Sequence, residues 1–158
     1  MKLTGLTLAG VLVAGAALAN VVSPDEVTFG EYGEVEASLT GSDGDAEKGR
    51  EIFSEKSQGN CVSCHALAAL PDVPFQGEVG PALDIVGEYR TPAELRGIVA
   101  NAKKTFPETV MPSFYKTTGF IRPGDGFTGK AGTEPLPPLL DAQQIEDVVA
   151  FLATLKEE

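Results

Sequence analysis

Two cysteines and a histidine stand together in the run Cys61-Val62-Ser63-Cys64-His65. The pattern C-x-x-C-H is the attachment site of a c-type haem, because two cysteines at this spacing can each form a thioether with a vinyl group of one porphyrin. The histidine that follows can then bind the iron through an imidazole nitrogen. The sequence therefore predicts one covalently bound haem c, with a protein core that forms around it.

Other uses of the two cysteines explain less of this run. A thioredoxin-like C-x-x-C motif belongs in a βαβ unit, and the sequence shows no such unit. A zinc site needs about four ligands, whereas the chain has two cysteines and one histidine. A structural disulfide between Cys61 and Cys64 stays open, although it gives the adjacent His65 no role.

Met111 is the candidate for the second axial ligand of the iron. It is the only methionine besides Met1, and no second histidine competes with it. A thioether ligand raises the reduction potential of a haem, which suits a protein that accepts electrons. The alternative is that Met111 only fills space in the core, as methionines commonly do.

The first residues have the features of a signal peptide. Residues 3–18 are almost wholly apolar behind Lys2, and Ala17-Leu18-Ala19 offers small residues to a signal peptidase. We therefore expect residues 1–19 to be cleaved and the protein to be periplasmic, which also fits the attachment of haem c outside the cytoplasm. The alternative is an uncleaved anchor, but the run is shorter than the about 20 residues of a membrane span.

Charge is spread unevenly along this acidic chain. The net charge of −11 argues against nucleic acid and against an anionic membrane as partners. Residues 20–47 contain eight acids and no base, whereas bases outnumber acids around Met111, between residues 101 and 130: Lys103, Lys104, Lys116, Arg122 and Lys130. This basic segment either steers an acidic partner towards the haem or is an ordinary solvated surface.

The chain divides into an acidic segment and one domain. Residues 20–44 lack a sustained apolar period, so we expect an N-terminal extension rather than a packed element. The extension is either disordered or an arm that orders against a partner, with Phe29 and Tyr32 as anchors. Residues 45–158 suffice for a single modest domain.

Helix signals predict an all-α domain with long loops. Asp45 is the expected N-cap of the first helix, and Gly49 within that helix suggests that another backbone approaches closely. Residues 61–65 should form a helical turn, and capping boxes at Thr91 and Asp141 should open two further helices. The last helix carries an apolar stripe: Ile145, Val148, Val149, Leu152 and Leu155.

In this order the motifs resemble those of small monohaem cytochromes c of the first class. The resemblance covers about residues 45–155 and rests on five blocks: Asp45–Phe53, Cys61–His65, Gly80–Leu83, Met111–Phe114 and Ile145–Leu152. It implies that residues 45–158 are a cytochrome c domain whose helices wrap around one haem, with the first helix crossing the last. It also implies that Pro81, after Gly80, accepts a hydrogen bond from His65 through its carbonyl group, and that Leu83 packs on the porphyrin.

More narrowly, the chain resembles the SoxX family, the small haem subunits of SoxAX complexes in bacterial sulfur oxidation. The supporting blocks are Val79–Leu83, Val110–Tyr115 and Leu140–Leu152, and the acidic extension and an insert at residues 116–136 also fit. The resemblance implies a redox subunit of an L-cysteine S-thiosulfotransferase. The larger SoxA subunit joins thiosulfate to a cysteine of the carrier SoxYZ, and SoxX passes the electrons to a soluble cytochrome c.

This interpretation gives the chain no catalytic residue of its own, because haem would use both cysteines and iron would use the one histidine. Two alternatives stay open. One is a free periplasmic electron carrier, and the other is a haem enzyme in its own right, which would require that Met111 does not ligate. The extension and the insert exceed what a minimal carrier needs, which favours a permanent partner.

Overall fold

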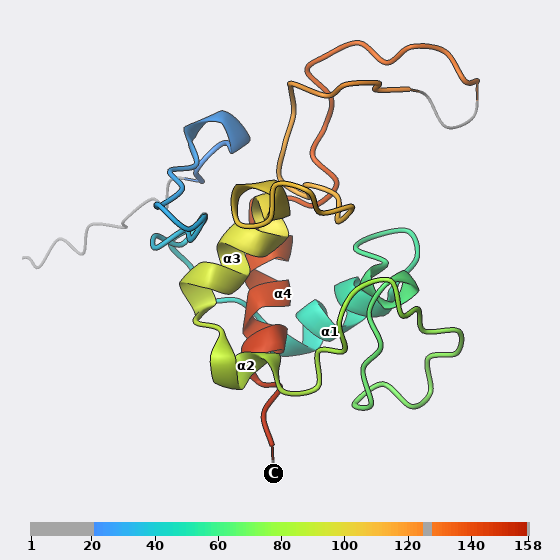
Figure 1. Ribbon diagram of the computed structural model, residues 1–158. Helices are drawn as coiled ribbons and strands as arrows, with labels where there is room; N and C mark the ends of the chain where they lie inside the picture. The colour runs from blue at the N-terminus through green and yellow to red at the C-terminus, as the bar shows by residue number, and fades with distance from the viewer. Residues whose placement is uncertain (1–20, 125–127, 158) are drawn as a thin grey trace, which may run out of the picture.

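The computed structural model describes residues 21–124 and 128–157, and in them the fold is helical. The elements in chain order are η1 (Pro24–Glu26), α1 (Ala46–Ser54), η2 (Cys61–Ser63), α2 (Val86–Tyr89), α3 (Pro92–Asn101), η3 (Ala102–Lys104) and α4 (Ala142–Ala153), where η denotes a 3-10 helix. The only β-type pairing in these residues is an isolated bridge between Gly124 and Ala131. Figure 1 shows α4 at the centre with α1, α2 and α3 around it and long loops outside. The predicted all-α fold is confirmed, and α2, η1 and η3 were not predicted.

None of the described helices combines the length and the hydrophobicity that a membrane span requires. Residues 1–19, the predicted signal peptide, and Asn20 lie outside the described residues.

The three predicted helix starts are present with their caps. The Asp45 carboxylate accepts hydrogen bonds from two backbone N–H groups in the first turn of α1. Thr91 and Asp141 open α3 and α4 through capping boxes, in which the side chains of Glu94 and Gln144 accept a hydrogen bond from the backbone N–H of the cap residue. Each cap satisfies donors that a helix N-terminus otherwise leaves unpaired.

The first and last helices cross at the glycine that the sequence singled out. A Cβ atom on Gly49 would overlap the carbonyl oxygen of Asp147, so only glycine allows the two backbones to come this close. Beside the crossing, the rings of Phe53 and Phe151 pack edge to face with centroids 5.6 Å apart. The predicted apolar stripe is buried in the same core: Ile145, Val148, Val149 and Leu152 on α4, and Leu155 just beyond its end.

Residues 22–44 pack against the domain, and the prediction of an unpacked extension is wrong for them. The side chains of Val35 and Leu39 are only 3% and 1% exposed. The Val22 N–H donates to the Leu39 carbonyl group at 2.8 Å, and the Tyr115 hydroxyl donates to the Val22 carbonyl group at 2.6 Å. Only a few apolar residues of this segment are buried, so its sequence shows no apolar period. Tyr32, a predicted partner anchor, is 75% exposed.

A buried ion pair fastens this segment to the helices. Arg96 on α3 donates to both carboxylate oxygens of Glu146 on α4, at 2.8 and 2.9 Å. The same carboxylate accepts the Leu39 N–H at 2.7 Å, and the guanidinium donates to the Val35 carbonyl group at 2.8 Å. Arg96 and Glu146 are 8% and 4% exposed. One ion pair therefore joins three parts of the chain.

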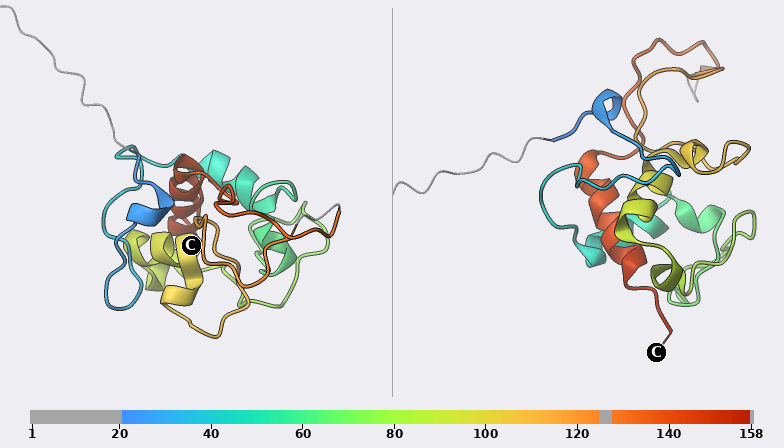
Figure 2. Two further views of the ribbon diagram at one scale, coloured as in Figure 1. Left: turned by 90° about the horizontal axis from the view of Figure 1, so that it is seen from above. Right: turned by 60° about the vertical axis from the view of Figure 1, so that its left-hand side comes forward.

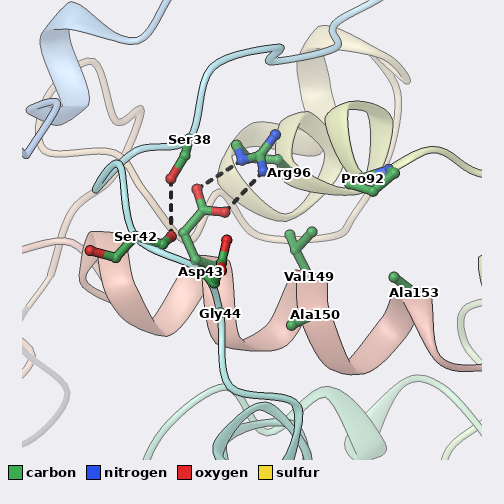
Figure 3. A pocket seen from close by; sticks show the side chains of 10 residues that line it. Ser38, Ser42, Asp43, Gly44, Pro92, Arg96, Val149, Ala150 and Ala153 are labelled. Carbon is green, nitrogen blue, oxygen red and sulfur yellow. Dashed lines mark hydrogen bonds and ion pairs between the residues drawn. The ribbon is translucent and has the colours of Figure 1, made fainter.

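A pocket of about 270 Å³ lies next to the ion pair, between residues 38–44, α3 and α4. Figure 3 shows Arg96 reaching across it, with Pro92 and Val149 on its walls. Arg96 and Glu146, the two buried charged residues that line the pocket, already bind each other, and no buried side-chain polar atom in the described residues lacks a hydrogen bond. The pocket therefore offers no buried unpaired group for chemistry.

Candidate haem-binding site

The two cysteines and the histidine lie on one tight turn. Asn60 enters it in the left-handed conformation (φ 49°), and η2 follows over Cys61–Ser63. The N–H groups of Cys64 and His65 both donate to the Cys61 carbonyl group, at 3.0 and 2.9 Å. Both cysteines are free thiols, so the structure contains no disulfide between them. The predicted helical turn is present, in the 3-10 form.

The environment of Cys61 disfavours an ionised sulfur. Burial raises the pKa of the Cys61 thiol to about 12, and the neighbouring Cys64 adds to the shift. Cys61 packs against the apolar core. A thioether carries no charge to desolvate, so this position suits a sulfur that ends as a covalent link to a porphyrin.

The segment that contains Gly80, Pro81 and Leu83 lies along the cysteine–histidine turn. Three backbone N–H groups of this segment donate to carbonyl groups of the turn and its continuation: Gly77 to Val62 at 2.8 Å, Gly80 to Cys64 at 2.8 Å, and Leu83 to Ala66 at 3.2 Å. Leu83 is half-buried against the core. These bonds hold Gly80 and Pro81 in a fixed place beside His65.

Pro81 orients the His65 ring. The carbonyl oxygen of Pro81 lies 2.8 Å from Nδ1 of His65. A carbonyl oxygen can only accept a hydrogen bond, so Nδ1 carries the proton and Nε2 keeps a free lone pair. A histidine held in this way is a typical metal ligand, because the hydrogen bond at one ring nitrogen fixes the ring and raises the basicity of the other nitrogen.

Gly80 leaves the space that this ring occupies. A Cβ atom at position 80 would lie 2.7 Å from Nδ1 of His65 and still closer to its Cε1. We expect Gly80→Ala to push the imidazole away from Pro81 and to lower the free energy of unfolding by about 1–3 kcal/mol. The measurements are chemical denaturation of the haem-loaded protein and the shifted NMR signals of the haem ligands. Gly124→Ala, whose nearest neighbour atom would be at 3.6 Å, should change neither; equal effects would show that His65 is not crowded by position 80.

Met111 lies on a separate loop that follows α3 and η3. Its side chain is half-buried and packs against the core. Its N–H donates to the Thr109 hydroxyl at 3.2 Å, and its carbonyl group accepts from Nζ of Lys103 at 2.6 Å. In Figure 1 and in the right view of Figure 2, this loop lies on the same side of α4 as the cysteine–histidine turn.

The residues present fit a haem. The structure combines two free thiols, an imidazole with a free Nε2, and a thioether on a second loop. Exposed apolar side chains flank both segments: Val79 and Ile85 near the turn, and Val110 next to Met111. In the described part of the chain, no three histidine, cysteine or carboxylate side chains gather as a metal cluster, so a zinc site has no ligand set here.

Comparison with known proteins agrees with this geometry. The family model for cytochrome c matches residues 46–156. The chain belongs to the cytochrome c family. Its cofactor is therefore a covalently bound haem c, as the sequence predicted.

Among solved structures, the cytochrome is similar to a chain of the crystal structure of SoxXA from P. pantotrophus. The two share 62% sequence identity, and the TM-score is 0.82. The match covers 85% of this chain and 98% of that chain. A search of the curated proteins finds no match. The predicted SoxX type and the predicted class I cytochrome c fold are confirmed.

The structure adds residues that the sequence did not single out. Lys103 was counted only as one charge of a basic segment, yet its ammonium group binds the backbone of Met111. Lys104 lies over the Phe29 ring at 5.5 Å, and Lys116 donates to the Gly119 carbonyl group at 2.8 Å. Much of the basic segment is thus engaged within the chain, and its role in steering a partner stays a prediction.

Proposed function

We propose that this cytochrome is the electron-transfer subunit of a periplasmic thiosulfate-oxidising SoxXA complex, also written SoxAX. The observation that carries the proposal is the 62% identity over nearly the whole length of a chain from SoxXA. In the complex, a larger SoxA-like haem subunit would join thiosulfate to a cysteine of the carrier SoxYZ. This chain would accept the electrons released and pass them to a soluble cytochrome c. The same match argues against a free carrier.

Each proposed site residue then has one task. Cys61 and Cys64 would hold the porphyrin covalently, and His65 would bind iron through Nε2 while Pro81 fixes its ring. Met111 would supply the second iron ligand through its sulfur. The bound haem supplies one-electron redox chemistry. With His65 and Met111 both engaged as ligands, the iron would have no site left for a substrate, so we assign no catalytic residue to this chain.

The remaining organisation follows from the same proposal. Residues 1–19 would be removed on export to the periplasm, where haem c is attached. Residues 117–124 and 128–136 form a loop that stands away from the helices (Figure 1). It is closed by the Leu136 N–H, which donates to the Thr117 carbonyl group at 2.8 Å, and it leaves Ile121 98% exposed. We assign this loop as a contact with the larger subunit.

The native mass of the protein purified from its host tests the proposal. We expect a larger haem subunit to travel with it at equal stoichiometry, identified by mass spectrometry. In the purified complex, the haem of this chain should become reduced when thiosulfate and a carrier protein with a free cysteine are added together. The protein could instead purify as a lone monomer, with no haem subunit in the same periplasm able to reduce its haem. That result would contradict the assignment and favour a free electron carrier.

A further inference from the structure

Close to Met111 itself, hydrogen bonds with side chains hold the Met111 loop. Val110 is 82% exposed and Pro112 is also exposed, so burial on either side of Met111 contributes little to its position. The loop is tied to the end of α3 just beyond, where the Ser113 hydroxyl donates to the Asn101 side-chain oxygen at 2.7 Å. The backbone of Met111 itself therefore depends on the groups that bind it directly.

Two side chains bind the two backbone polar groups of Met111. Thr109 accepts the Met111 N–H through its hydroxyl oxygen at 3.2 Å, and Lys103 donates from Nζ to the Met111 carbonyl oxygen at 2.6 Å. The hydrogen bond from Lys103 is shorter than the one to Thr109, and its donor is a charged ammonium group. Charge-assisted hydrogen bonds are roughly twice as strong as neutral ones. Lys103 comes from η3, which continues directly from α3. The bond thus connects the ligand loop to a helix.

We propose that Lys103 is a positioning residue that holds Met111 on the haem iron by binding its backbone carbonyl group. The inference rests on the proposed ligand set, in which Met111 is the axial thioether. A loop held in this way keeps the sulfur in place when the iron changes oxidation state, so electron transfer needs little rearrangement. Without the bond, the loop has more freedom, and the sulfur dissociates from the iron more often.

Lys104 provides a matched control. It is the next residue, is exposed, and has the same charge, but its Nζ lies over the Phe29 ring and not on the Met111 loop. Loss of either lysine removes one positive charge from the same region. A difference between the two variants therefore reports the hydrogen bond and not the charge.

The test measures how easily an added ligand displaces Met111. Imidazole is titrated into the oxidised, haem-loaded protein, and the far-red sulfur-to-iron absorption band reports the methionine bond. We expect Lys103→Met to increase the apparent affinity for imidazole about tenfold. Losing one hydrogen bond that holds a metal ligand in place typically has an effect of this size. Lys104→Met should leave this affinity unchanged. Lys103→Arg, which keeps a charged donor, should restore most of the original affinity.

Three results would overturn the inference. Equal imidazole affinity for the unaltered protein and Lys103→Met would show that Lys103 does not hold the ligand. Equal changes in Lys103→Met and Lys104→Met would assign the effect to charge alone. Absence of the far-red band in the unaltered protein would remove Met111 from the ligand set and Lys103 from its role. None of these results depends on a partner subunit, so the assignment to a SoxXA complex is tested separately.

Discussion

Replacing Met111 with alanine should lower the reduction potential of the haem by on the order of 0.2 V, within the roughly 0.8 V range over which axial ligands set haem potentials. The thioether favours the reduced iron, and alanine provides no ligand in its place. The sixth position would then be open to water or to added imidazole. Potentiometric titration and the far-red absorption band measure the two effects.

Val110→Ala is the control for this experiment. Val110 is adjacent to Met111 and 82% exposed, so its truncation alters the same loop without removing a ligand or core packing. We expect its potential and spectrum to match those of the unaltered protein. If Met111→Ala also leaves both unchanged, Met111 is a core residue and another group, or none, occupies the sixth position.

Replacing Glu146 with alanine should lower the free energy of unfolding by about 3–5 kcal/mol, because it leaves a buried charge without its partner. Arg96 would keep a guanidinium that is shielded from water, and the Leu39 N–H would lose its acceptor. Chemical denaturation of the haem-loaded protein measures the loss. Residues 22–44 should also become sensitive to limited proteolysis, since the carboxylate holds this segment to α4.

Two further variants make this prediction specific. Lys48→Ala breaks the exposed pair with Asp45, whose charged atoms are 3.4 Å apart, and it should cost at most about 1 kcal/mol. Replacing Arg96 by methionine together with Glu146 by leucine should cost less than Glu146→Ala alone, because no unpaired charge remains. If Glu146→Ala costs no more than Lys48→Ala, the ion pair does not fasten the segment.

Signals that act over a few residues could be predicted from the sequence. The C-x-x-C-H run specifies its haem chemistry within five residues. The caps at Asp45, Thr91 and Asp141 each bind backbone groups within the next turn. The stripe of α4 follows from helical periodicity, and Gly49 was recognisable because glycine is costly inside a helix unless another backbone needs the space.

Only the tertiary structure shows the contacts between distant parts of the chain. Leu39 and Glu146 are 107 positions apart, and Arg96 and Glu146 are 50 apart, so no local pattern marks them. Residues 22–44 pack through their bonds to that ion pair and through a few buried apolar side chains, and they have no apolar period. Lys103 could be read from the sequence as a surface charge. Its bond to Met111 exists only because η3 and the ligand loop are folded against each other.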